Sequence, residues 1–184
     1  MQRLIIITGD LAAGKSTLAS ALSDELRIPF ITKDRLKEIA CDIFGFHNRQ
    51  ENRLLSEVAV DSMIYFFAQS AQTGQDLIIE ANFRSTELAK IKAIAEQNAY
   101  QVVLILLAGD IKLLYQRFLD RLPLRHIAHR VDNIEHSFET FAQYIEEMRD
   151  EDLIFSPFEI DMSDLDEEEV VDKALGIIYR EMGQ

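Results

Sequence analysis

The chain has 184 residues, of which 48% are hydrophobic and 28% charged, a balance typical of a globular protein rather than a disordered or fibrous one. Its 19 basic and 32 acidic residues give a formal net charge of −13, and so negative a surface argues against duplex nucleic acid as a ligand. The longest apolar run, residues 102–108, is too short to span a bilayer, and no signal peptide is expected. We therefore expect one domain over residues 1–184, cytoplasmic and without a membrane partner.

Short apolar runs alternate with longer amphipathic segments along the whole chain. This alternation is typical of parallel strands that are buried on both faces and joined by helices. Strands are expected over residues 4–8, 29–32, 77–80, 102–107 and 158–162, and helices over residues 15–26, 35–44, 51–72, 86–97, 111–122, 133–150 and 167–182. The pattern predicts an α/β protein with three layers, in which helices cover both faces of a five-stranded sheet.

The first strand and the first helix are joined by a glycine-rich loop, residues 9–17, that matches the pattern G-x-x-x-x-G-K-[ST]. Glycine at both ends lets such a loop curl until its backbone N–H groups face phosphate oxygens, with the positive end of the helix beneath. Lys15 is expected to reach the β- and γ-phosphates and Ser16 to bind Mg²⁺. Asp10 is an unusual residue beside phosphates, and we expect its side chain to point outward. The predicted nucleotide contacts in the loop are Gly9, Asp10, Leu11, Ala12, Ala13, Gly14, Lys15, Ser16 and Thr17.

The second strand leads into residues 33–38, where Asp34 lies at the start of a helix on the carboxyl edge of the sheet. Ligands of such folds bind at this edge, and a carboxylate there can accept the proton of an acceptor hydroxyl. The alternative is that Asp34 caps the helix, and the two roles are compatible. The base-reading motif N-K-x-D of GTPases is absent from the sequence, which favours a kinase.

Several positions in the middle of the chain predict packing rather than chemistry. In the helix of residues 51–72, apolar side chains recur every three or four positions and predict one buried stripe, made of Leu54, Leu55, Val58, Ala59, Met63, Phe66 and Phe67. Gly74 is placed to end that helix, and Ser85 and Asp110 are placed to cap the next two. Cys41 lies among apolar residues and is expected to be a core thiol.

The third strand ends in Glu80, and Asn82 follows two residues later. A strand beside the phosphate loop commonly delivers an acid that orders a water ligand of Mg²⁺ or contacts the acceptor, and Glu80 is a candidate for both roles. The alternative is an ordinary carboxylate at the end of a strand. Asn82 is a candidate hydrogen-bond partner of the acceptor, although a turn would use the same residue.

Basic residues gather after the fourth strand, where residues 112–130 hold five Lys or Arg side chains against one acid, Asp120. Arg117 and Arg121 share a helical face, and Pro123 is expected to end that helix. The residues that then fall on the following loop are Arg125, His126, His129 and Arg130. A basic lid over about residues 117–133 is predicted, because guanidinium groups can clamp a transferring phosphoryl group while a closing loop excludes water. The alternative is a set of surface arginines that pair with Asp120 and Glu135.

These residues together resemble the small phosphate-loop kinases of the family that includes the zeta toxins, chloramphenicol phosphotransferase, the kinase domain of polynucleotide kinase, and gluconate and shikimate kinases. The resemblance rests on residues 9–17, 33–38, 79–83 and 117–129, which span most of the chain. It implies a P-loop NTPase fold with a five-stranded parallel sheet in the order 2-3-1-4-5, and ATP with Mg²⁺ as cofactors.

The resemblance also implies roles for single residues. Asp34 would be the base, and Arg121 and Arg125 would be catalytic lid arginines together with Lys15 of the loop. Arg117 would contact the nucleotide. The acceptor would be contacted by Asp34, Lys37, Glu80 and Asn82. In polynucleotide kinase an arginine stands where this chain has Lys37, so bidentate recognition of an acceptor phosphate is not expected here.

The sequence thus predicts an ATP-dependent kinase that transfers the γ-phosphoryl group of MgATP to a hydroxyl of a small molecule. Two alternatives stay open. One is a nucleoside monophosphate kinase, because residues 9–11 look like the loop of some cytidylate-kinase-like proteins. The other is a regulatory module that binds ATP to set a conformation without phosphorylating a soluble acceptor.

Overall fold

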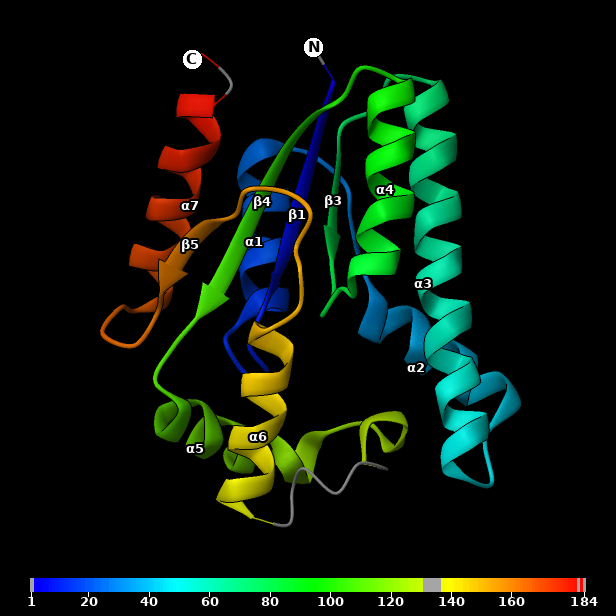
Figure 1. The fold of residues 1–184 in the computed structure, drawn as a ribbon, viewed down its shortest axis with the longest axis vertical. Coiled ribbons are helices and arrows are strands. Elements are labelled where there is room, and N and C mark those ends of the chain that lie inside the picture. The colour runs from blue at the N-terminus through cyan, green and yellow to red at the C-terminus, as the bar shows by residue number, and fades with distance from the viewer. Residues whose placement is uncertain (1, 131–136, 182, 184) are drawn as a thin grey trace.

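The computed structural model describes residues 2–130, 137–181 and 183 of the chain. Within these residues a parallel sheet lies at the centre (Figure 1), made of β1 Arg3–Gly9, β2 Phe30–Thr32, β3 Leu77–Glu80, β4 Gln101–Ala108 and β5 Phe158–Asp161. The strand order is β2-β3-β1-β4-β5, which confirms the order implied by the resemblance. β1 is central, because Ile5 pairs with Ile78 of β3 on one side and with Val103 of β4 on the other.

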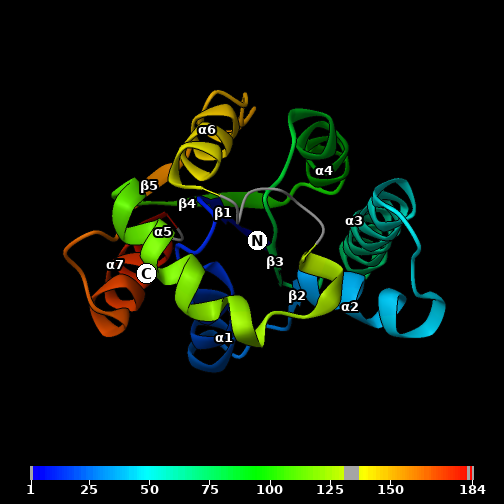
Figure 2. The ribbon, with the colours of Figure 1, turned by 90° about the horizontal axis from the view of Figure 1, so that it is seen from below.

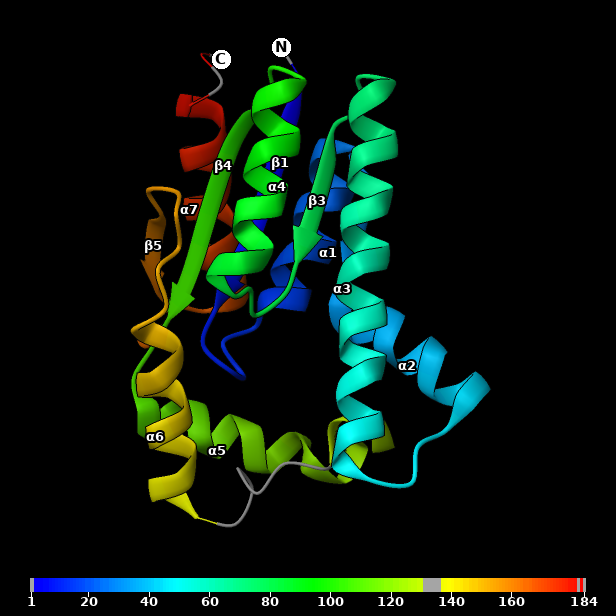
Figure 3. The same ribbon diagram turned by 45° about the vertical axis from the view of Figure 1, so that its right-hand side comes forward.

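Helices pack on both faces of the sheet and beyond its carboxyl edge. They are α1 Lys15–Leu26, α2 Lys33–Phe44, α3 Arg49–Gln72, α4 Ser85–Gln97, α5 Ile111–Arg121, α6 Phe138–Arg149 and α7 Glu167–Glu181. α1 and α7 cover one face and α3 and α4 the other, whereas α5 and α6 lie beyond the carboxyl ends of the strands (Figures 1 and 2). Two 3₁₀ turns, Leu122–Leu124 and Ile127–His129, follow α5 and carry the chain toward α2 (Figure 3). None of the described helices is long and apolar enough to cross a membrane.

The apolar run of β1 is explained by burial on both faces. Leu4 and Ile6 face the core formed with α3 and α4, and Ile5 and Ile7 face the core formed with α1 and α7. All four side chains have no exposed surface. A strand covered by helices on both sides has no polar face, so its residues form a continuous apolar run rather than an alternation of apolar and polar residues.

The stripe predicted along α3 is only partly buried. Four of its members are in the core, namely Leu55, Ala59, Met63 and Phe67, whereas Leu54, Val58 and Phe66 are exposed by 53%, 53% and 47%. The prediction of one core stripe was therefore wrong for these three residues. The reason is that α3 meets the sheet, α2 and α4 along one face only, and apolar periodicity cannot tell a packed row from the row beside it.

The predicted helix ends are mostly confirmed. The Asp110 carboxylate caps α5 by accepting hydrogen bonds from the N–H groups of Lys112 and Leu113, each at 3.0 Å. Gly74 follows α3 with a left-handed φ of 67°. Ser85 was predicted as a cap and is instead the first residue of α4: the N-cap is Arg84, whose N–H donates to the Glu87 carboxylate at 2.8 Å, while the Ser85 N–H donates to the Glu151 carboxylate at 2.7 Å.

The start of α6 also differs from its prediction. The helix begins at Phe138, after Ser137 caps it by accepting a hydrogen bond from Thr140 N at 3.2 Å. The predicted helical residues 133–136, the lid residues 131–133, Glu135 and Met182 lie outside the described residues. Cys41 is buried, as expected.

Candidate active site

The glycine-rich loop lies between the carboxyl end of β1 and the start of α1. Gly9 has a φ of 127° and Gly14 a φ of 87°, a region that side chains rarely allow. A Cβ atom on Gly9 would lie 2.0 Å from the carbonyl oxygen of Leu107 in β4. Glycine is therefore required at the first position of the loop by backbone contact as well as by φ.

The Lys15 side chain lies over this loop. Its ammonium donates hydrogen bonds to the carbonyl oxygens of Gly9 at 3.0 Å and Asp10 at 2.6 Å, and the residue is only 8% exposed. Burial lowers the pKa of Lys15, and the charges of Glu80 and Asp34 oppose that change. A cation held at the mouth of a loop of backbone amides is suited to phosphate oxygens.

Ser16 and Glu80 meet beside the loop. The Ser16 hydroxyl donates a hydrogen bond to Glu80 Oε2 at 3.0 Å, across 64 residues of sequence. Glu80 is 4% exposed, and burial raises the pKa of its carboxyl group while the charge of Lys15 opposes that rise. Two neighbouring oxygen ligands of this kind fit a Mg²⁺ ion, which prefers hard oxygen donors and keeps several waters.

A cavity of about 510 Å³ opens at the carboxyl edge of the sheet. The structure brings twelve predicted site residues to its wall: Leu11, Ala12, Gly14, Lys15, Ser16, Thr17, Asp34, Lys37, Glu80, Asn82, Arg121 and Arg125. Gly9, Asp10, Ala13 and Arg117 are not part of the wall. The loop, α2, the end of β3 and the lid thus surround one space.

Asp34 lies in the first turn of α2 with a side chain that is 60% exposed. The residue that caps α2 is Thr32, whose hydroxyl accepts a hydrogen bond from Arg35 N at 3.3 Å. Because the N-cap is already supplied, the alternative in which Asp34 serves as the cap is wrong. Its carboxylate stays available to a ligand in the cavity.

The described part of the predicted lid, residues 117–130, is held by its own contacts. The Arg125 guanidinium lies 5.0 Å from the centre of the Phe118 ring, a distance typical of a cation–π contact. Arg130 donates hydrogen bonds to the carbonyl oxygens of Arg125 at 2.8 Å and Pro123 at 2.9 Å. Asp120, the proposed surface partner of these arginines, accepts a hydrogen bond from Gln116 at 2.9 Å. Arg130 therefore shapes the lid, and Arg125 faces the cavity.

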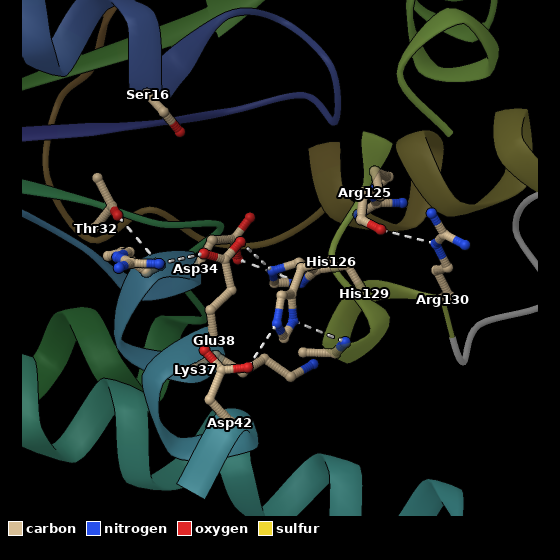
Figure 4. Close-up of polar contacts among 12 residues, drawn as sticks. Ser16, Thr32, Asp34, Lys37, Glu38, Asp42, Arg125, His126, His129 and Arg130 are labelled. Atoms are coloured by element: carbon tan, nitrogen blue, oxygen red, sulfur yellow. Dashed lines mark hydrogen bonds and ion pairs between the residues drawn. The ribbon is translucent and has the colours of Figure 1, made fainter. Parts of the chain in front are cut away.

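Two lid histidines contact carboxylates of α2 (Figure 4). His126 Nε2 lies 3.0 Å from Asp42 Oδ1, and His129 Nε2 lies 3.3 Å from Glu38 Oε1. His129 Nδ1 is also 4.0 Å from Asp34 Oδ1. Burial lowers the pKa of His129, against the effect of the Asp34 charge.

Two buried hydrogen bonds through Asn52 form a third contact between the lid and the rest of the protein. The Lys37 ammonium donates to Asn52 Oδ1 at 2.9 Å, and Asn52 Nδ2 donates to the carbonyl oxygen of Ala128 at 2.9 Å. Sequence reasoning missed Asn52, Glu38 and Asp42. Their partners in residues 126–129 are 76 to 91 residues away, and no local pattern marks such pairs.

Two predicted site residues point elsewhere. Asp10 was expected to point outward from the phosphates, and its side chain does not line the cavity; it is not on the surface, however, because it is 3% exposed and its carboxylate is ion-paired with Arg149 at 2.6 Å. Arg117 contacts the sulfur of Met162, just after β5, at 3.4 Å. Its predicted contact with the nucleotide stays a prediction.

The fold places the protein in a structural class, because the solved structures that it resembles include several kinases. A predicted kinase from Chloroflexus aurantiacus is 26% identical with a TM-score of 0.78, covering 95% of this chain and 97% of that one. A shikimate kinase from Bacteroides thetaiotaomicron is 16% identical with a TM-score of 0.64, covering 99% of each chain. A gluconokinase from Sinorhizobium meliloti is 18% identical with a TM-score of 0.63, covering 97% and 92%. The chain has the P-loop kinase fold.

A family model gives the narrower assignment. The zeta toxin model matches residues 2–170, nearly the whole chain, and the protein belongs to this family. No curated protein gives a significant match.

Proposed function

We propose that the protein is one kinase domain that transfers the γ-phosphoryl group of MgATP to a hydroxyl of a small-molecule acceptor. The observation that carries the proposal is that Lys15, Asp34, Glu80, Arg121 and Arg125 line one and the same cavity of about 510 Å³. A phosphate-binding loop alone would serve any nucleotide-binding protein. A carboxylate and guanidinium groups facing the same loop across a cavity are what phosphoryl transfer to a second substrate requires.

The nucleotide would be held by the loop amides and Lys15. Ser16 and Glu80 would hold Mg²⁺, directly and through water, and the bound ion would neutralise charge on the β- and γ-phosphates. Glu80 is almost fully buried beside Lys15, and bound Mg²⁺ would give its carboxylate a second cationic partner.

Asp34 would accept the proton of the acceptor hydroxyl as that oxygen bonds to the γ-phosphorus and the bond to ADP breaks. Arg121 and Arg125 would stabilise the negative charge on the transferring group, which a low-dielectric site strengthens. Lys37 and Asn82 line the same cavity and would contact the acceptor. The presence of a gluconokinase and a shikimate kinase among the structural neighbours supports a small-molecule acceptor.

The test is ADP release in a coupled assay with MgATP and a panel of acceptors. The panel holds nucleoside monophosphates, sugars, sugar nucleotides, aminoglycosides and 5′-hydroxyl oligonucleotides. Lys15→Ala is the blank, because it removes the cation over the loop. The proposal predicts that at least one acceptor raises ADP release in the wild type and none does so in the blank.

Asp34→Asn separates binding from transfer. It should keep the rise in melting temperature that MgATP causes and lose the stimulation by the acceptor, because only the proton-accepting charge is removed. Asp24→Asn, on an exposed position of α1, is the matched control and should keep both. ATP binding with no stimulation by any acceptor would favour the regulatory module, and stimulation by nucleotides alone would favour the nucleoside monophosphate kinase. Absence of any response to MgATP in the wild type would refute the proposal.

A further inference from the structure

We infer that Asp10 and Arg149 are a positioning pair for the nucleotide site, which fixes the phosphate loop and joins it to the helix that supports the lid. The inference rests on the proposed function, because it assumes that the loop binds nucleotide phosphates. Neither residue lines the cavity, so the pair acts through the loop rather than on the ligand.

Both oxygens of the Asp10 carboxylate accept hydrogen bonds from fixed partners. Arg149 Nε donates to Oδ1 at 3.2 Å and Arg149 Nη2 donates to Oδ2 at 2.6 Å. The N–H of Gly109, which follows β4, donates to Oδ2 at 3.1 Å, and Arg149 Nη2 also donates to the Gly109 carbonyl oxygen at 2.7 Å. A bidentate guanidinium pair of this kind fixes geometry as well as charge. Asp10 therefore has one defined orientation, with both oxygens turned away from the cavity.

The backbone of Asp10 is tied to the nucleotide site itself. Its carbonyl oxygen accepts the Lys15 ammonium at 2.6 Å, and its N–H donates to the Leu107 carbonyl oxygen at 2.8 Å. The side chain, N–H and C=O of one loop residue are thus bonded to three different parts of the protein. Rotation of Asp10 would move the carbonyl oxygen that accepts the Lys15 hydrogen bond, so the ion pair with Arg149 helps to fix the position of the Lys15 ammonium.

The charge of Asp10 gives the pair a second effect. Asp10 is close enough to Lys15 that its charge acts on the pKa of that residue. A lone carboxylate in a phosphate loop would repel the phosphates that the loop has to bind. Arg149 neutralises this charge with a guanidinium that is 41% exposed, while the carboxylate is 3% exposed.

Arg149 also links the loop to the lid, because it is the last residue of α6. Near the other end of α6, the Phe141 ring lies 5.2 Å from the ring of Phe118 in α5. Phe118 in turn supports the Arg125 guanidinium. Figure 1 shows α6 extending from the region of the loop to α5. One packed helix thus connects the phosphate loop with the aromatic ring beneath a lid arginine.

The chain offers a matched control two residues further on. The Glu151 carboxylate accepts a hydrogen bond from Ser85 N at 2.7 Å and pairs with Arg84 at 3.1 Å, which joins the same end of α6 to the start of α4. Glu151→Gln weakens a tertiary ion pair at this place without touching the loop. A purely structural role for Arg149 predicts the same result in both variants.

The experiment measures the affinity of the full chain for the magnesium complex of adenylyl imidodiphosphate by calorimetry, and the melting temperature without nucleotide. Arg149→Met should weaken affinity at least about tenfold, because the loop is no longer fixed and Asp10 is left as an unpaired carboxylate beside the bound phosphates. Arg149→Lys keeps the charge and should lose less. In the double variant Asp10→Asn with Arg149→Met, affinity should recover only in part, because the lone carboxylate is gone but the bonds from Arg149 that fix the loop are still missing. Glu151→Gln should keep affinity within about twofold.

The outcomes separate this inference from the proposed function. If the wild type binds the nucleotide analogue and the affinities of Arg149→Met and Arg149→Lys are both within twofold of the wild-type affinity, the inference is overturned and the kinase proposal stands. A loss of affinity in Glu151→Gln equal to that in Arg149→Met would also overturn it, since the effect would then come from α6 stability alone. If Arg149→Met does not fold, Arg149→Lys carries the same comparison. A wild-type chain that binds no nucleotide would overturn both proposals.

Discussion

Replacement of Asn52 by alanine tests how firmly the lid is held. Asn52 is 6% exposed on α3 and makes two buried hydrogen bonds, one from the Lys37 ammonium and one to the Ala128 carbonyl oxygen in the lid, each at 2.9 Å. A hydrogen bond to a charged group contributes about 1.5–3 kcal/mol and a neutral one about 0.5–1.5 kcal/mol. We therefore expect Asn52→Ala to lower the free energy of unfolding by about 2–4 kcal/mol.

For a chain of this size, that loss corresponds to a fall in melting temperature of roughly 5–15 °C. Urea unfolding followed by circular dichroism measures the free energy, and a thermal scan measures the midpoint. Gln50→Ala, at an exposed position on the same helix, is the control and should stay within about 0.5 kcal/mol of the wild type. A value for Asn52→Ala equally close to the wild type would refute the reasoning, because it would mean that neither bond is needed to hold the lid.

Two further predictions concern backbone fit and pH. Gly9→Ala should lower the free energy of unfolding by about 3 kcal/mol or more, because its Cβ would lie 2.0 Å from the Leu107 carbonyl oxygen and a φ of 127° strains any side chain. Gly176→Ala in α7 is the control: a Cβ there would meet nothing within 4 Å, and alanine should raise the free energy of unfolding by about 0.5–1 kcal/mol. Urea unfolding measures both, and equal effects would contradict the argument. Burial lowers the pKa of His129 below its ordinary value of 6.5, so the unfolded chain binds the proton more readily and stability should fall as pH drops below about 6.5. Unfolding at pH 7.5 and 5.5 should show a larger loss in the wild type than in His129→Gln; the same loss in both would exclude His129 as the cause.

The parts of the protein that the sequence predicts well are local. The phosphate loop, the five strands and most helix limits follow from spacing within about 20 residues, and the structure agrees with them to within a few residues. Local spacing sets backbone conformation and apolar periodicity, which need no partner from elsewhere in the chain. The strand order came from the resemblance, because periodicity alone does not say which strands are neighbours.

The sequence could not separate the two rows of apolar residues on α3. Leu55 and Leu54 are adjacent and chemically identical, yet the first is 7% exposed and the second 53%. The sequence also did not show that α4 begins one residue earlier than expected, where the N–H of Ser85 meets a carboxylate 66 residues away. In each case the deciding partner is a long-range one.

The site divides along the same line. By itself the sequence determined that Lys15 and Ser16 lie in a phosphate loop and that Asp34 and Glu80 each lie near the carboxyl end of a strand, because these positions depend only on the elements that carry them. Only the tertiary structure decided that Asp10 turns inward to Arg149, 139 residues away, and that the lid histidines meet α2. Such pairs form where packing brings two distant charged groups together in a partly buried place, and a one-dimensional pattern holds no record of that distance.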